Sequence, residues 1–138
     1  MKIKNRITNE IIIERNVDTI IELVEIAMKE KISLEDANLI NTNLMGVNLI
    51  GVDLSNADLS NADLIDADLS NANLGGADLT DADLGGVDLL DANLSNVNLS
   101  NANLSNANLR NADLSNVNLI GVNLIDADLR NANIDKNN

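Results

Sequence analysis

Aspartate is the side chain with the most chemistry to offer in this sequence, because histidine, cysteine and all aromatic residues are absent. Ten aspartates crowd a stretch in which no Lys or Arg occurs. We treat them as one candidate acidic surface, made up of Asp53, Asp58, Asp63, Asp66, Asp68, Asp78, Asp81, Asp83, Asp88 and Asp91. Clustered carboxylates can serve as an acid–base pair, as oxygen ligands for a divalent cation, or as a negative surface for a basic partner.

Catalysis and metal binding are the less favoured of these three uses. An acid–base pair needs a cleft with groups that position a substrate, and a regular sequence without inserted loops offers neither. Calcium needs a cage of about six to eight oxygens, whereas evenly spaced aspartates offer a row of single ones. We therefore expect a protein that is not an enzyme, with no catalytic residues, no metal site and no cofactor.

The negative charge is confined to one part of the chain. Residues 1–31 hold six basic and six acidic groups, whereas residues 32–138 hold 16 acidic groups against three basic ones. The whole net charge of −13 therefore lies after residue 31. This balance argues against direct nucleic-acid binding and favours a protein partner, which the sequence does not identify. The longest apolar run, residues 11–13, is too short for a membrane span, so we expect a cytoplasmic protein without membrane contact.

A strict period of five residues positions the aspartates. Leu recurs at every fifth position from Leu34 to Leu129, and Ile134 follows in phase. Ala or Val usually stands two residues before each centre, and Asn or Asp directly before it. Five residues advance a helix by about 140°, and an odd spacing reverses the face of a strand. The leucines can share one interior only if the backbone bends in each unit, which the Asn, Asp, Ser and Gly residues permit.

The repeated pattern A-(D/N)-L-x-x, as in "ADLSNADLIDADLSNANL" at residues 57–74, resembles the pentapeptide-repeat family. The resemblance implies an all-β solenoid, a right-handed quadrilateral β-helix with four pentapeptides in each coil. On that basis residues 32–136 make about five coils, and residues 137–138 form a tail. Coils of this size would stack Asp58 near Asp78, Asp63 near Asp83 and Asp68 near Asp88, so that like charges repel.

The first 31 residues are predicted to cap the N-terminal end of the solenoid. Residues 18–31 have the apolar spacing of an amphipathic helix, with Asp18 or Thr19 as its N-cap. Two short strands are predicted upstream, on either side of residues 8–9. We expect the helix to cover the first coil, with a partner-binding helix as the alternative.

The C-terminal end has no comparable capping segment in the sequence. The last coil should expose an edge that we name the candidate dimer end, formed by Leu119, Ile120, Leu124, Ile125, Leu129 and Ile134. Members of the family dimerise end to end through this region. The resemblance therefore implies a homodimer joined near residues 115–134.

Two functions remain open at this point. The first is a rigid acidic scaffold or protein-binding module, and the alternative is a DNA mimic that inhibits or protects type II topoisomerase (gyrase), as the fluoroquinolone-resistance group of the family does. Thirteen net charges on a rod about 25 Å long approach the density of B-DNA, about one per 1.7 Å. This chain departs from that group because it is short, has no Phe at any centre and has no loop between coils. The aspartates could also be corner residues that only aid solubility and interchange freely with Asn.

Overall fold

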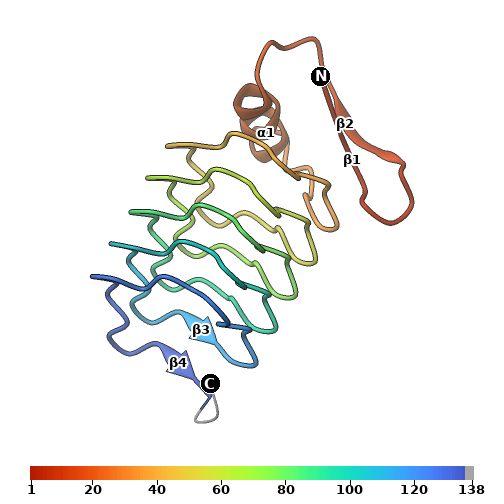
Figure 1. Ribbon diagram of the computed structural model, residues 1–138. Helices are drawn as coiled ribbons and strands as arrows, with labels where there is room; N and C mark the ends of the chain where they lie inside the picture. The colour runs from red at the N-terminus through yellow and green to blue at the C-terminus, as the bar shows by residue number, and fades with distance from the viewer. Residues whose placement is uncertain (136–138) are drawn as a thin grey trace.

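The computed structural model describes residues 1–135, which form a stack of coils with a helix and a hairpin at the N-terminal end (Figure 1). The elements, in chain order, are β1 (Lys2–Lys4), β2 (Ile11–Glu14), α1 (Ile20–Lys29), β3 (Asp113–Leu114) and β4 (Asn133–Ile134). The end of the predicted repeat at Lys136 and the predicted tail at 137–138 lie outside the described residues. No helix within residues 1–135 is long and apolar enough to cross a membrane.

Each repeat unit closes a β-turn that starts at its leucine. In one such turn the amide of Ala57 donates to the carbonyl of Leu54 over 3.0 Å, and the same bond recurs along the coils. The third residue of the turn has a positive φ, between 54° and 73°, at every fifth position from Asp36 to Asn131. Asn, Asp or Gly fills all of these positions, and these residues adopt the left-handed conformation at the least cost. The chain therefore bends once in every unit, as the five-residue period predicts.

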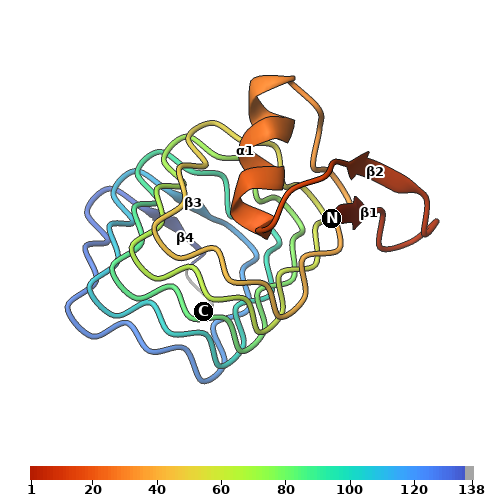
Figure 2. The same cartoon turned by 90° about the horizontal axis from the view of Figure 1, so that it is seen from above.

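Successive coils pair in parallel through residues twenty positions apart. Asp58 bridges Asn38 in the coil before it and Asp78 in the coil after it, and equivalent bridges continue along the rod. The amide of Leu59 donates to the carbonyl of Asp78 over 2.8 Å, while the amide of Asp58 donates to that of Ala37 over 2.9 Å. Because twenty residues return the chain to its starting side, each turn of the rod holds four pentapeptides. Viewed from above, the coils lie over one another (Figure 2).

Regular strands are scarcer than the prediction of an all-β fold suggests. β3 and β4 pair in parallel over two residues each, and the other contacts between the coils are isolated bridges. The cause is the turn in each unit, which leaves only a short extended segment between corners. The right-handed winding and the count of about five coils stay predictions.

The interior of the rod is built almost entirely from leucine and small aliphatic residues. Every repeat leucine from Leu34 to Leu114 is at most 2% exposed, and wherever Ala or Val stands two residues before one of these leucines it is buried as well. No polar or charged side chain within the described residues is buried. Each buried leucine contributes about 1.5–3 kcal/mol before its loss of conformational entropy is subtracted. Stability therefore comes from many equivalent, modest contributions along the stack.

Helix α1 lies over the N-terminal end of the first coil, where the sequence predicts a cap (Figure 1). It buries Leu23, Val24 and Ala27 against the core of the rod. Of the two candidate N-caps, Thr19 has this role, because its Oγ1 accepts the amide of Glu22 at 3.1 Å. This bond satisfies one of the free amides in the first turn of the helix.

The helix is shorter than the predicted range of residues 18–31, which was wrong at both ends. It stops early because Lys31 takes a positive φ of 57° and turns the chain toward the first coil. The amides of Lys31 and Ile32 donate back to the carbonyls of Met28 and Ala27, at 3.1 and 2.8 Å. This is a Schellman ending, in which glycine more often occupies the left-handed position that Lys31 takes here.

Strands β1 and β2 lie on either side of residues 8–9, as predicted, and they pair as an antiparallel hairpin. Ile3 lies opposite Ile13, and both side chains are buried. The C-terminal end of β1 pairs with the first coil, where the amide of Asn38 donates to the carbonyl of Lys4 over 2.8 Å. The hairpin therefore covers one stretch of coil edge that would otherwise expose unpaired backbone groups.

Truncation of a central leucine tests the packing of the rod. We expect Leu79→Ala, at a fully buried centre, to lower the free energy of unfolding by about 2–5 kcal/mol because it leaves a cavity. Leu129→Ala, at a partly buried centre of the last described coil, should cost clearly less. Urea denaturation of both variants measures the difference. Equal losses, or a loss below about 1 kcal/mol for Leu79→Ala, would contradict a tube packed to its axis.

Candidate acidic interaction surface

The structure divides the ten candidate aspartates into two sets. The side set lies directly before a leucine, on the flat sides of the rod, and comprises Asp53, Asp58, Asp63, Asp68, Asp78, Asp83 and Asp88. The corner set lies at the positive-φ position of the turns and comprises Asp66, Asp81 and Asp91. The sequence already contains this distinction, since one set precedes the leucine and the other follows it by two residues. Treating all ten as one acidic surface overlooked it.

Aspartates of the side set are held by their own turns. Oδ1 of Asp58 accepts the amide of Ser60 at 3.1 Å and its hydroxyl at 2.7 Å. Oδ1 of Asp63 accepts the amide of Ile65 at 3.2 Å. This bond to the amide two residues on fixes the carboxylate against the rod. Within residues 1–135, Oδ2 of each aspartate in the side set accepts no hydrogen bond, so it is available to a partner.

Three pairs of side-set aspartates stack between the same two coils. Parallel bridges join them on three sides of the rod, as Asp58 with Asp78, Asp63 with Asp83 and Asp68 with Asp88. We name these three pairs the acidic belt. Neighbouring coils lie about 4.8 Å apart, so the paired carboxylates repel each other, and salt screens this repulsion. The predicted stacking of these residues is therefore present in the structure.

Asparagine replaces aspartate on the C-terminal side of the belt and changes the contact. Nδ2 of Asn103 donates to Oδ1 of Asp83 at 2.8 Å, and Nδ2 of Asn123 donates to Oδ1 of Asn103 at 2.9 Å. Asn108 donates in the same way to Asp88 at 2.9 Å. A carboxylate cannot donate such a bond, so the pairs of the belt lack it. Asp and Asn therefore make different contacts between coils at these positions.

The arginines of the repeat lie toward its C-terminal end, and Arg110 belongs to the coil next to Asp88. Arg130 and Arg110 occupy equivalent positions in adjacent coils near the C-terminal end. Nε of Arg130 donates to Oδ1 and Oδ2 of Asp128 at 2.8 and 3.0 Å. This pairing, helped by the amide of Arg130 and the charge of Arg110, lowers the pKa of Asp128 to about 2. Hydrogen bonds from Ser115 and Asn133 lower the pKa of Asp113 as well. Neither aspartate belongs to the candidate surface.

The candidate dimer end is uncovered in the described chain. Ile120, Ile125 and Ile134 are 74%, 66% and 37% exposed. The remaining members of the set, Leu119, Leu124 and Leu129, are only partly buried. In the preceding coil the amide of Leu104 donates to the carbonyl of Asn123, whereas those of Leu124 and Leu129 find no acceptor within residues 1–135. The last coil thus offers both apolar side chains and an open backbone edge.

No group of three or more acidic side chains in the described part of the chain is placed to hold a metal ion. Two hollows of about 340 Å³ occur at the N-terminal cap, one under the end of α1 and one on its outer face. Asp53 borders the first, and no aspartate of the belt borders either.

A turn in every fifth residue, with bridges twenty residues apart, defines a repeat β-helix protein. The family model for pentapeptide repeats matches residues 31–66, 62–101 and 98–135, with 8 copies. The chain therefore belongs to the pentapeptide-repeat family, and the resemblance is confirmed.

Solved structures of the same family are similar to the rod. A pentapeptide repeat protein from the Arabidopsis thaliana thylakoid lumen is 32% identical, with a TM-score of 0.63 over 64% of this chain and 62% of that one. One from Nostoc PCC 7120 is 33% identical, with a TM-score of 0.54 over 89% and 91%. One from the cyanobacterium Cyanothece 51142 is 39% identical, with a TM-score of 0.50 over 75% and 63%. The chain spans less than two thirds of the first and third of these proteins. A comparison with the curated proteins finds no match.

The acidic belt predicts that one well-placed amide will stabilise the rod. In Asp83→Asn, the new Nδ2 can donate to Oδ1 of Asp63, and the like-charge contact disappears. We expect the free energy of unfolding at low salt to rise by about 0.5–1.5 kcal/mol, and this gain to shrink as salt is added. Urea denaturation at two salt concentrations measures it.

The control for this substitution is Asp81→Asn, which removes the same charge from a turn corner outside the stacks. It should change stability less than Asp83→Asn. Equal effects of the two substitutions would mean that only net charge matters, and that the stacked pair has no energetic consequence of its own.

Proposed function

We propose that this chain is a non-enzymatic, rigid acidic scaffold that binds a basic surface on a protein partner. The acidic belt is the observation that carries the proposal. Folding alone favours asparagine at these positions, because the asparagine ladder adds hydrogen bonds between coils whereas stacked aspartates repel. Residues that oppose the stability of a fold are expected at functional surfaces.

The geometry of the side set suits recognition of arginine or lysine. Each carboxylate is oriented by the bond from its turn amide to Oδ1, while Oδ2 accepts nothing within residues 1–135. A partner's guanidinium or ammonium group can therefore reach an acceptor that loses little freedom on binding. No Lys or Arg occurs between Lys31 and Arg110 to compete for it. Long-range attraction from the rod would also speed encounter with a basic partner.

The belt can be separated from net charge by two variants with equal charge. The side variant replaces Asp58, Asp63, Asp78 and Asp83 with Asn, and the corner variant replaces Asp66, Asp81, Asp91 and Asp126 with Asn. We expect the native chain and the corner variant to capture the same partner from a cell extract, and the side variant to lose it. Quantitative pull-down at low and moderate salt measures this. Retention by the side variant, or equal loss from both variants, would contradict the proposal.

A second candidate is the DNA mimic directed at type II topoisomerase. The similar charge density of the rod and of B-DNA favours it, as does the placement of charge on several sides of the rod. A supercoiling assay with purified gyrase separates the two functions. Inhibition at low protein concentration would support the mimic, and no effect at roughly tens of micromolar would exclude it and leave the scaffold.

The proposal also includes a cytoplasmic protein that forms a homodimer through the candidate dimer end. Exposed Ile120 and Ile125 lie beside an open coil edge, which a second copy could cover. Ile40 and Met45 occupy the same columns at the opposite end of the rod, and they are also exposed. They therefore provide a matched control.

Light scattering after gel filtration tests the dimer. The native chain should elute with twice the mass of one copy, 14.7 kDa. The I120D/I125D variant should be monomeric, because the new charges would be buried unpaired at the interface, and the I40D/M45D variant should remain dimeric. A native monomer at high micromolar concentration, or equal behaviour of the two variants, would refute this arrangement.

A further inference from the structure

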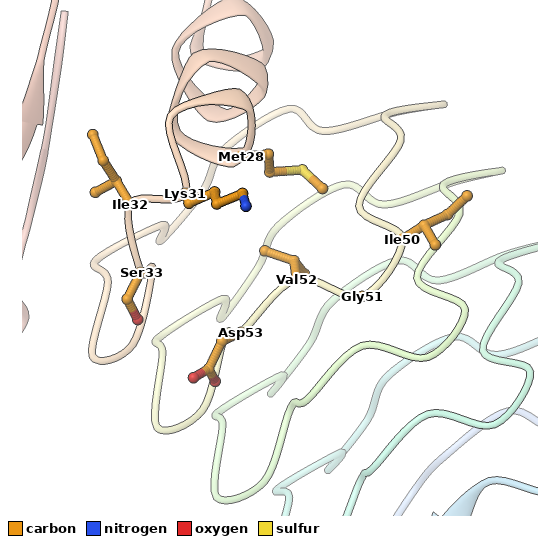
Figure 3. Close-up of a pocket in the computed structure, with 8 residues that line it drawn as sticks. All are labelled: Met28, Lys31, Ile32, Ser33, Ile50, Gly51, Val52 and Asp53. Atoms are coloured by element: carbon orange, nitrogen blue, oxygen red, sulfur yellow. The ribbon is translucent and has the colours of Figure 1, made fainter.

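A cavity of about 340 Å³ lies between the C-terminal end of α1 and the first coil (Figure 3). Beside it, the segment that enters the rod is not yet paired with the following coil. Parallel bridges between coils begin at Asn38, and within the described chain no bridge joins Ser33 to Asp53, although the two are twenty residues apart. The Schellman turn at Lys31 thus holds the entering segment away from the coil above which it passes.

Part of the cavity wall is apolar, because four of the eight residues that line the cavity have apolar side chains. Met28 reaches into it from the last turn of α1, and Ile50 and Val52 border it from the first coil (Figure 3). Ile50 is 47% exposed, and Val52 is the most exposed of the buried small residues of the rod, at 7%. The cavity is therefore accessible from solvent, and a short aliphatic group placed in it would lose contact with water.

One positive charge faces this apolar wall. The side chain of Lys31 extends toward Met28 and Val52 (Figure 3). Its ammonium group makes no ion pair or hydrogen bond with any residue of 1–135. The nearby carboxylate of Asp53 points away from the helix in the same view, and its Oδ1 accepts bonds from Ser55 and Asn73 instead. The Lys31 ammonium is therefore an unused donor at the edge of this cavity.

A backbone amide adds a second donor at this end of the rod. In the following coil the amide of Asn73 donates to the carbonyl of Val52 over 2.9 Å. The equivalent amide, that of Asp53, has no paired carbonyl before it and donates to no acceptor within residues 1–135. Since each such amide is directed toward the N-terminal end, that of Asp53 faces the side on which the cavity lies.

We propose that this cavity binds a carboxylate carried on a short aliphatic group, with Lys31 and the Asp53 amide as donors to the carboxylate. Met28, Ile50 and Val52 enclose the aliphatic part. The ligand is either a free aliphatic acid or the apolar C-terminal residue of a peptide, because both present the same chemistry. The site is independent of the acidic belt, which attracts groups of the opposite charge.

Two matched pairs of probes test the chemistry and its source. Sodium hexanoate is compared with 1-hexanol, and the peptide acetyl-Ala-Val-Leu with a free C-terminus is compared with its C-terminal amide. Each is titrated into the full chain labelled with nitrogen-15, and amide shifts are followed by NMR. We expect at least one acid to shift the amides of residues 28–33 and 50–53, and to bind about tenfold more tightly than its neutral counterpart.

Two pairs of variants assign the binding to this cavity. Lys31→Gln should weaken binding of the acid about tenfold, whereas Lys29→Gln, which removes a charge from the outer face of the same helix, should not. Ile50→Ser should weaken it as well, whereas Ile40→Ser, exposed in the same coil, should not. Thermal unfolding of each variant checks that the fold is intact.

The outcomes separate cleanly. Binding of hexanoate alone identifies a free acid as the ligand source, and binding of the peptide acid identifies a chain terminus. Failure of both acids to shift these amides, neutral probes that bind equally well, or full binding by Lys31→Gln would each overturn the proposal. None of these results bears on the acidic belt, so the two proposals stand or fall separately.

Discussion

The left-handed corner in every fifth residue is the constraint on which the rest of the structure depends. Each corner directs one leucine to the axis, and the residue just before that leucine points outward as a consequence. After four corners the backbone has completed one coil. Amides of that coil then donate to carbonyls of the next, as the amide of Leu59 donates to the carbonyl of Asp78. Asn, Asp or Gly must occupy the corner, since a side chain that disfavours positive φ would strain every turn. At Gly76 even a Cβ atom would lie only 2.6 Å from Oδ1 of Asn56 in the coil before it.

This regularity explains why the sequence predicts the rod better than its ends. Period, composition and turn chemistry together predict the buried leucines, the corners and the stacking of Asp58 on Asp78, because each follows from position in the unit. The helix bounds were less predictable, since they depend on Lys31 taking a conformation that glycine usually takes. The pairing of Asn38 with the end of β1, and the cavity beside Lys31, depend on how the cap packs on the first coil. No local sequence pattern predicts how the cap packs on the first coil.

The candidate surface also combines features that follow from the repeat unit with features that arise only when the coils stack. The outward position of the side-set aspartates can be read from the repeat, and so can their difference from the corner set. The bond from Asn103 to Asp83 requires the twenty-residue register, and it is this bond that makes asparagine and aspartate unequal. The acidic belt is therefore a feature of the assembled stack. It surrounds the rod with oriented carboxylates on three of its sides.

The account is tested most directly by the hydrogen bonds between coils, because corners, core and belt all require them. Scalar couplings across hydrogen bonds, measured by NMR, identify which carbonyl each amide donates to. The account predicts a coupling between the amide of Leu59 and the carbonyl of Asp78, with equivalent pairs at intervals of five residues along the rod. A coupling from the Leu59 amide to the carbonyl of Ser55, four residues earlier, would indicate a helix and contradict it.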